Sequence, residues 1–233
     1  QQTIADLRVF RAAAKNDPFA GQAGLFDLLD RDVIVVFVES YGRTSLDTPL
    51  YANLHRETLT NAQTELEALG LAMSSTLLAS PTQGGQSWLA HSTFANGLWI
   101  ADQTSYRAAL SSGRQTLFHL AGQSGFHTAA VMPQITLDWP EAQFMGFETI
   151  LAEADLGYAG QPFNWITMPD QFTFAAMDRL LRDRRSDGRP FFIQMALASS
   201  HAPWVPVPEV IDWNALGDGT VFDPLVAASD PPR

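Results

Sequence analysis

The run DVIVVFVESYG, residues 32–42, joins six consecutive apolar residues to a glutamate and then a glycine. A short run of mainly β-branched residues is typical of a strand with both faces buried, as in a parallel sheet. Ligands of open α/β sheets bind outside the carboxyl ends of such strands. Glu39, at that end of the run, is therefore the first candidate functional side chain, although a strand-end glutamate can also simply face water.

The spacing of apolar and turn residues predicts the remaining elements. Strands are predicted at residues 71–79, 127–132, 147–151 and 191–198, and helices at 4–15, 51–69, 88–96, 106–110, 116–122 and 169–184. The order of strand, helix and strand over residues 33–79 is a βαβ unit, which builds parallel sheets. We therefore expect an α/β fold with a mostly parallel sheet sandwiched between helices, and a polar tail over residues 223–233.

Composition excludes several classes of site. The 233 residues, 46% of them hydrophobic, suffice for one large α/β domain. The net charge is −11 and Lys15 is the only lysine, so no basic stripe exists and no nucleic-acid partner is expected. The absence of cysteine excludes disulfides, zinc–thiolate sites and a cysteine nucleophile. No apolar run approaches the roughly 18 residues of a membrane span.

A glycine-rich turn, SPTQGGQS at residues 80–87, leads into the predicted helix at 88–96. Such a turn lets the backbone approach an anion and aims amide N–H groups and the positive end of the helix at it. Ser87, at the helix start, is therefore a candidate nucleophile. The alternative is that Ser87 only caps the helix, because serine is strongly preferred at the N-cap position.

The predicted strand at 191–198 runs into a histidine turn, SHAPW at residues 200–204. Because parallel strands end at the same edge of a sheet, we expect Glu39, Ser87 and His201 to converge. A divalent metal on Glu39 could lower the pKa of the Ser87 hydroxyl during phosphoryl or sulfuryl transfer. His201 could hold a substrate oxygen or protonate the leaving group.

The segments VFVESYG (36–42), QGGQS (83–87) and SHAPW (200–204), in this order, resemble the sulfatase-like members of the alkaline phosphatase superfamily. The most similar members are the membrane-anchored lipoteichoic acid synthases and the related phosphoglycerol or phosphoethanolamine transferases. The resemblance covers residues 32–204. It implies an alkaline phosphatase-like α/β/α fold and a metal-dependent phosphodiester transferase or hydrolase of the cell envelope.

The resemblance also implies roles for individual residues. Glu39 corresponds to a metal ligand, Ser87 to the nucleophile that also contacts the metal, and His201 to a residue of the substrate pocket. Trp139 corresponds to a tryptophan of the headgroup pocket, but Pro140-Glu141 replaces the polar and basic residues expected next. The implied cofactor is one divalent ion, Mn, Mg or Zn, and the implied substrate is a phospholipid headgroup or another phosphodiester.

The sequence departs from the family pattern in two places, and each departure leads to a further expectation. Sulfatases proper convert a Cys or Ser followed by x-Pro-x-Arg into formylglycine, whereas Ser87 is followed by Trp-Leu-Ala-His, so a sulfatase is disfavoured. No Asp-His pair, which completes the family's metal site, follows Trp204. We therefore expect a catalytic domain over residues 32–233 that lacks its closing strand at the C-terminus and is inactive alone. Residues 1–31 would be a helix and connector leading from a membrane segment outside this chain, with the site on the extracytoplasmic face.

The residues alone are also compatible with two other functions. GQSWL at 85–89 nearly matches the Gly-x-Ser-x-Gly turn of α/β-hydrolases, with His201 as the later histidine, which would make the chain a serine esterase. A non-catalytic relative that binds a headgroup is the second alternative. His91, one turn after Ser87, is interpreted as a helix-face residue.

Overall fold

A four-stranded parallel sheet forms the centre of the computed structural model, which describes residues 3–182, 184 and 188–228. The strands are β1 (Val33–Phe37), β2 (His127–Met132), β3 (Thr149–Ala152) and β4 (Phe191–Ala196), in the spatial order β1-β4-β2-β3. The register pairs Val35 with Gln194, and Ala130 with the same Gln194 from the other side. The predicted α/β fold with a parallel sheet is confirmed.

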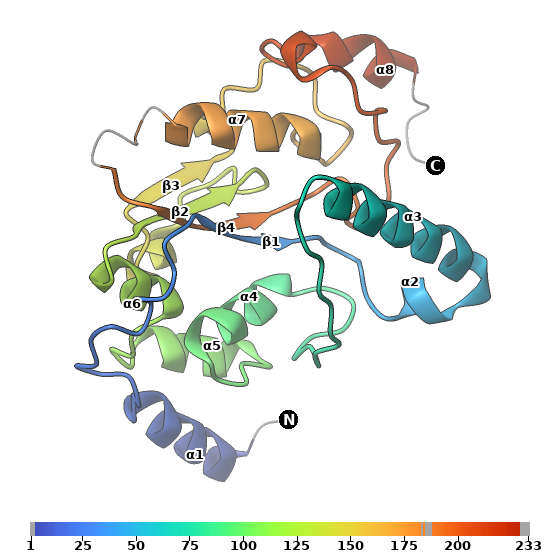
Figure 1. The fold of residues 1–233 in the computed structure, drawn as a ribbon. Helices are drawn as coiled ribbons and strands as arrows, with labels where there is room; N and C mark the ends of the chain where they lie inside the picture. The colour runs from blue at the N-terminus through green and yellow to red at the C-terminus, as the bar shows by residue number, and fades with distance from the viewer. Residues whose placement is uncertain (1–2, 183, 185–187, 229–233) are drawn as a thin grey trace. The chain divides into compact units, whose positions relative to one another are not determined.

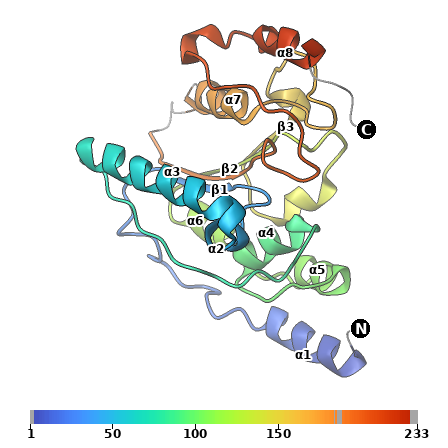
Figure 2. The ribbon, with the colours of Figure 1, turned by 90° about the vertical axis from the view of Figure 1, so that its right-hand side faces the viewer.

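Helices cover both faces of this sheet (Figures 1 and 2). The helices of this part of the chain are α1 (Ile4–Lys15), α4 (Ser87–Asn96), α5 (Gln103–Leu110), α6 (Leu117–Gln123), α7 (Asp170–Arg182) and α8 (Asp223–Ala228), with short 3₁₀ helices at Pro140–Phe144, Glu153–Asp155, Trp213–Ala215 and Thr220–Phe222. In both views α7 lies on one face with α8 beyond it, and α4, α5 and α6 lie on the other. This is the α/β/α sandwich that the sequence predicted.

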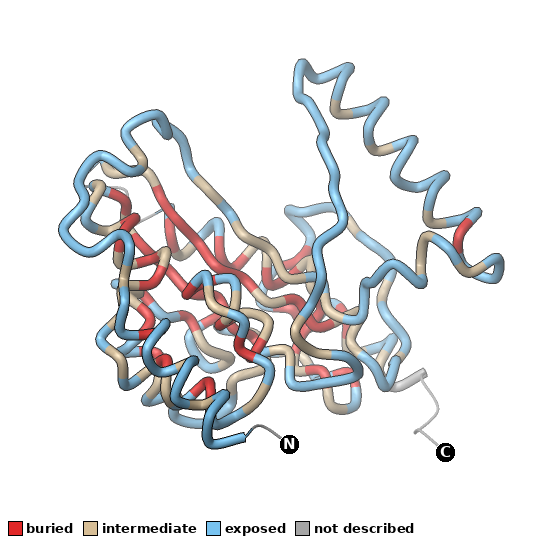
Figure 3. The backbone as a smooth tube through the Cα atoms, turned by 90° about the horizontal axis from the view of Figure 1, so that it is seen from below, coloured by how far each residue is buried: buried red, intermediate tan, exposed pale blue. Residues whose placement is uncertain are grey.

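Side chains of β4 alternate between two cores because the side-chain period of a strand is two. Ile193 and Met195 pack with the apolar stripe of α7, whereas Phe192 packs with Phe118 and Phe126 on the opposite face. The buried residues follow the sheet and the helix faces turned towards it (Figure 3). Full burial of each phenylalanine contributes on the order of 1.5–3 kcal/mol, so the two cores hold the strand ends in fixed positions.

Two strand predictions are wrong. The expected strand at residues 71–79 does not form, and every one of those residues is exposed. The neighbour of β1 is instead β4, so residues 33–79 are not a βαβ unit. The strand β1 was also expected to be buried on both faces, but within the described residues it is an edge strand, and Ile34 is 45% exposed.

Residues 40–80 form a compact unit of their own, distinct from the unit of residues 1–39 and 81–233. The smaller unit contains α2 (Thr44–Asp47) and α3 (Pro49–Ala68), and its His55 ring meets Tyr41 edge to face. In the larger unit, Phe10 of α1 packs against the cluster of Leu89, Ile100 and Tyr106.

The predicted polar tail is partly wrong, because Asp223–Ala228 forms α8, whereas residues 229–233 lie outside the described residues. Among the helices that the structure describes, none has both the length and the apolar character needed to span a bilayer.

Candidate active site

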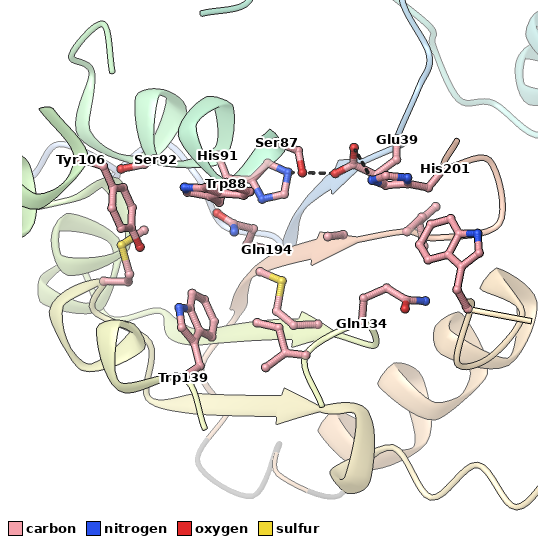
Figure 4. Close-up of a pocket in the computed structure, with 16 residues that line it drawn as sticks. Glu39, Ser87, Trp88, His91, Ser92, Tyr106, Gln134, Trp139, Gln194 and His201 are labelled. Atoms are coloured by element: carbon pink, nitrogen blue, oxygen red, sulfur yellow. Dashed lines mark ion pairs between the residues drawn. The ribbon is translucent and has the colours of Figure 1, made fainter. Parts of the chain in front are cut away.

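One cavity of about 300 Å³ on the α4 side of the sheet collects the predicted site residues. Glu39, Ser87, His201 and Trp139 all line it, and so does His91 (Figure 4). Glu39 follows β1, His201 follows β4, and Ser87 begins α4. The structure thus brings together side chains that are far apart in the sequence, and their roles remain predictions.

Ser87 is the first residue of α4, and the helix cap is the residue before it. Gln86 is the N-cap, in the left-handed conformation with φ 59°, and it makes no side-chain capping hydrogen bond. The interpretation of Ser87 as the N-cap is therefore wrong. Gly84 and Gly85 have φ values of 72° and 121°, which a residue with a Cβ rarely adopts, so this tight turn depends on its glycines.

The Ser87 hydroxyl lies near the carboxylate of Glu39, and its O–H group helps to lower the pKa of that carboxyl. Burial by itself raises the pKa of Glu39, but hydrogen bonds from His91 and Ser87, together with positive charge on His91 and His201, lower it below its ordinary value. Glu39 is thus an ionised carboxylate at neutral pH, in a partly dehydrated place where its charge acts strongly.

His91 is the site residue that the sequence interpretation missed. Its Nε2 lies 3.4 Å from Glu39 Oε1, its side chain is 14% exposed, and its ring packs on Phe37 with the centroids 4.0 Å apart. The signal was present in the sequence, because residues four apart lie on one face of a helix and His91 follows Ser87 by four. The sequence did not show that Glu39 lies close to His91.

His201 faces Glu39 through a defined ring nitrogen. Its Nδ1 lies 2.6 Å from the carbonyl oxygen of Ala202, and a carbonyl only accepts, so Nδ1 carries a proton. Its Nε2 points towards Glu39 Oε2 at 4.0 Å. The Trp165 ring meets the imidazole edge to face, with centroids 4.9 Å apart, and limits its rotation.

The turn that carries His201 is held from two sides. The Asp170 carboxylate, at the start of α7, accepts hydrogen bonds from the amides of Ala198 and Ser199 at 2.8 and 3.0 Å, and its own amide donates to Ser199 Oγ. Ser200 Oγ donates to the Glu39 carbonyl at 2.6 Å. These bonds tie the end of β4 to the end of β1, so the imidazole and the carboxylate keep a fixed separation.

Backbone strain gathers at this cavity. The described non-glycine residues with positive φ are Ser40, Gln86 and Asn164, and each directly precedes or follows a residue that lines the cavity. Such conformations cost on the order of 1–3 kcal/mol and are typical of functional sites.

Away from Glu39, the cavity is mainly apolar and aromatic. Trp139 lies on this side, as predicted for a pocket residue, and its indole lies near the hydroxyl of Tyr106. Burial and the nearby charge of Glu141 raise the pKa of Tyr106, so this hydroxyl keeps its proton. The space therefore offers flat apolar walls next to a charged edge.

The site contains oxygen atoms of the type that bind divalent cations. Glu39 supplies a carboxylate and Ser87 a hydroxyl, which are oxygen ligands suited to Mg or Mn. Two imidazoles lie beside the carboxylate, yet within the described residues no group of three or more His, Asp or Glu side chains is arranged to hold a metal ion. Glu39 and Ser87 are thus candidate ligands in an incomplete set.

Known proteins resemble this chain in sequence profile and in fold. The profile of the family described as Sulfatase matches residues 31–210. In fold the chain is similar to the lipoteichoic acid synthase LtaP from Listeria monocytogenes, at 15% identity and a TM-score of 0.60, covering 93% of this chain and 53% of LtaP. It thus spans about half the length of that protein.

A second similar structure is a protein in the alkaline phosphatase superfamily from Vibrio parahaemolyticus, at 13% identity and a TM-score of 0.45, covering 97% of this chain and 58% of that one. No curated protein matches the sequence.

Proposed function

Because the chain belongs to the sulfatase family, we propose that it carries the site of a metal-dependent enzyme that transfers a phosphoryl group from a phosphodiester to Ser87. The observation that supports this most is the meeting of Glu39, Ser87, His91 and His201 at one edge of the cavity. The helix α4 directs its positive end, with N–H groups that have no partner in the helix, to the same place. An anionic ester is the substrate that such an edge suits.

Phosphoryl transfer is favoured over sulfate ester hydrolysis by the residues after Ser87. The family's sulfatases need a nucleophile that can be converted to formylglycine, and the Trp-Leu-Ala-His that follows Ser87 lacks the required pattern. A plain serine can instead form a serine-linked phosphate ester, which keeps the second ester group of the substrate and later breaks down.

The reaction proposed for these residues has two displacements. Ser87 Oγ forms a bond to phosphorus while the bond from phosphorus to one ester oxygen breaks, and the hydroxyl proton passes to the nearby Glu39 carboxylate. An imidazolium, His201 or His91, gives its proton to the departing oxygen. Water or an acceptor alcohol then attacks phosphorus and releases Ser87. A divalent ion on Glu39 and Ser87 would, when bound, lower the pKa of the hydroxyl and offset charge on the phosphoryl oxygens.

The proposed substrate class is a phospholipid headgroup or another cell-envelope phosphodiester, with the site on the extracytoplasmic side of a membrane. The similarity in fold to a lipoteichoic acid synthase motivates this choice. The net charge of −11 disfavours nucleic acid as the phosphodiester.

Turnover that depends on a metal ion tests the proposed function. With the full-length protein and bis(4-nitrophenyl) phosphate, we expect EDTA to lower the release of nitrophenolate by at least about a hundredfold and Mn, Mg or Zn to restore it. The same assay on 4-nitrophenyl acetate and 4-nitrophenyl sulfate separates the alternatives. Chelator-resistant acetate hydrolysis would indicate an esterase, and no turnover of any ester would indicate a headgroup-binding relative.

Replacement of His201 by alanine is expected to lower phosphodiester turnover by about ten- to a hundredfold, because a proton donor near the leaving oxygen is lost. Metal content should stay near that of the wild type, since His201 is proposed to contact substrate. Elemental analysis beside the turnover assay checks both. His127→Ala is the matched control: that imidazole bonds Thr149 and Arg189 away from the cavity and should alter stability, not turnover. Loss of metal from His201→Ala would instead make His201 a ligand.

A further inference from the structure

Aromatic rings surround one end of the cavity. Trp88, Tyr106 and Trp139 all line the cavity, and in Figure 4 they lie around the end away from His201. We call this part of the cavity, defined by these three residues, the aromatic end. The proposed reaction gives none of the three rings a chemical role, so they are available to bind an alcohol that is esterified to phosphorus.

Contacts with the rest of the protein hold these rings in place. Trp88 Nε1 donates a hydrogen bond to Gln103 Oε1 at 3.2 Å. The Trp139 ring packs against Phe147, with the ring centroids 6.2 Å apart, and its indole lies near the Tyr106 hydroxyl. A bound group therefore meets aromatic surface that is already arranged before it enters.

The charges near the aromatic end are negative. The described residues that line the cavity include no lysine or arginine. Glu141, two residues after Trp139, forms no ion pair with a described cationic side chain. Burial and then the charge of Glu141 raise the pKa of Tyr106, so this charge acts at the wall of the cavity. The net charge of −11 adds a long-range potential of the same sign, so the aromatic end suits a cation.

The Ser87 edge of the cavity has the opposite preference. The helix α4 directs its positive end to this edge, which suits the phosphoryl oxygens of a substrate. A phosphodiester that carries a positive charge on one of its alcohols would therefore complement both parts of the cavity.

The hydrogen-bonding groups of the cavity favour one kind of cation. A primary ammonium group has three N–H donors that need acceptors, whereas a quaternary ammonium group has none. Glu39 is the one carboxylate among the described lining residues, and it already lies beside Ser87 and two imidazoles. A quaternary ammonium group is instead attracted to the faces of aromatic rings, and most strongly to tryptophan.

We propose that the substrate is a phosphodiester of a quaternary ammonium alcohol such as choline, with the cationic group bound by Trp88, Tyr106 and Trp139. This inference rests on the proposed function for the position of the phosphorus. It deepens that function by naming the alcohol and the residues that select it.

The proposed position of the cation also decides which ester bond breaks. Ser87 Oγ forms a bond to phosphorus, and the bond from phosphorus to the oxygen of the other alcohol breaks. That oxygen takes its proton on the side of His201, which lies away from the aromatic end in Figure 4. Water then attacks phosphorus, the bond to Ser87 Oγ breaks, the serine regains a proton, and phosphocholine leaves.

Titration calorimetry of the full-length protein tests the cation site apart from turnover. The probes are phosphocholine, phosphoethanolamine and 3,3-dimethylbutyl phosphate, in which a carbon atom replaces the quaternary nitrogen. All three share the phosphate group, so the ratio of their dissociation constants reports on the alcohol part alone. We expect phosphocholine to bind roughly tenfold more tightly than each of the other two.

Two variants test the residues that are assigned to the cation. Trp139→Leu removes an aromatic face and Glu141→Gln removes the negative charge, and each should lower the tenfold ratio to about threefold or less. Trp139→Phe keeps an aromatic face and should give an intermediate ratio. The matched controls are Trp99→Leu, at a 56% exposed residue outside the cavity lining, and Glu148→Gln, and both should keep the wild-type ratio. Glu141→Gln keeps the test valid if Trp139→Leu fails to fold.

Turnover distinguishes a lipid substrate from a soluble one. Phosphatidylcholine vesicles and dissolved glycerophosphocholine are supplied separately, and the released phosphocholine is measured. Faster release from vesicles would identify the lipid headgroup, and faster release from solution would identify the soluble diester. Release of free choline in place of phosphocholine would contradict the proposed position of the cation.

The inference is overturned if phosphoethanolamine or 3,3-dimethylbutyl phosphate binds as tightly as phosphocholine. It is also overturned if the ratio is the same in the wild type, in Trp139→Leu and in Glu141→Gln. The titrations need no turnover. A tenfold ratio in a protein that cleaves no ester would therefore support the quaternary ammonium site while rejecting the proposed reaction.

Discussion

Replacement of Ser87 by alanine in the full-length protein is expected to lower phosphodiester turnover by at least about a thousandfold, equivalent to about 4 kcal/mol of lost transition-state stabilisation. The physical reason is that alanine has no atom that can form the bond to phosphorus. The Ser87 hydroxyl lies at the positive end of α4 near the ionised Glu39, and a methyl group there also removes the O–H donor beside that carboxylate. Steady-state kinetics on a chromogenic phosphodiester, with saturating metal, measure the effect.

Two control variants test whether the loss of turnover is due to the hydroxyl group at residue 87. Ser87→Thr keeps a hydroxyl at the same position and should retain more activity than the alanine variant. Ser124→Ala removes a hydroxyl that bonds the Leu120 carbonyl at 2.9 Å outside the cavity, and turnover should stay within about twofold.

The alanine variant should also unfold close to the wild-type temperature, because Gln86 and not Ser87 is the N-cap, so the loss of about 1 kcal/mol typical of a removed cap does not apply. Turnover of Ser87→Ala within about tenfold of wild type would falsify the nucleophile assignment.

Replacement of Glu39 by glutamine is expected to remove most of the bound metal and to lower turnover by at least about a hundredfold at limiting metal concentration. Glutamine keeps the shape of the side chain and loses the negative charge that attracts a divalent ion. The lowered pKa of Glu39 means that the wild-type carboxylate carries this charge throughout the neutral range. Metal per protein from elemental analysis and turnover against added Mn are the two measurements.

The control is a second carboxylate, which pairs with an arginine and does not line the cavity. Glu148 pairs with Arg189 through two hydrogen bonds of 2.9 Å. The variant Glu148→Gln should therefore lower stability and leave metal content unchanged. Equal metal content in Glu39→Gln and wild type would show that Glu39 is not a metal ligand. Its role would then be to position Ser87 and the two imidazoles.

The sequence alone predicted the elements whose signal is local. The apolar runs of β1, β2 and β4 and the amphipathic stripes of α1 and α7 appear where the pattern placed them, because a run of β-branched or periodic apolar residues carries its own preference. The three ordered segments around Glu39, Ser87 and His201 also pointed to the sulfatase family before any distance was known.

Strand neighbours were decided only by the tertiary structure. Residues 71–79 have the composition of a strand, but a strand forms only where a partner offers its backbone groups. Within the described residues no strand pairs with 71–79, and β1 pairs with β4 from far along the chain. The consequence for the site is that Ser87 reaches Glu39 through the strained Gly84-Gly85-Gln86 turn and not from the end of a strand.

The same limit explains His91. The spacing of Ser87 and His91 is visible in the sequence, but the carboxylate that gives His91 its place arrives from β1. Local pattern determines which elements form, whereas pairing across the fold determines which side chains meet at the site.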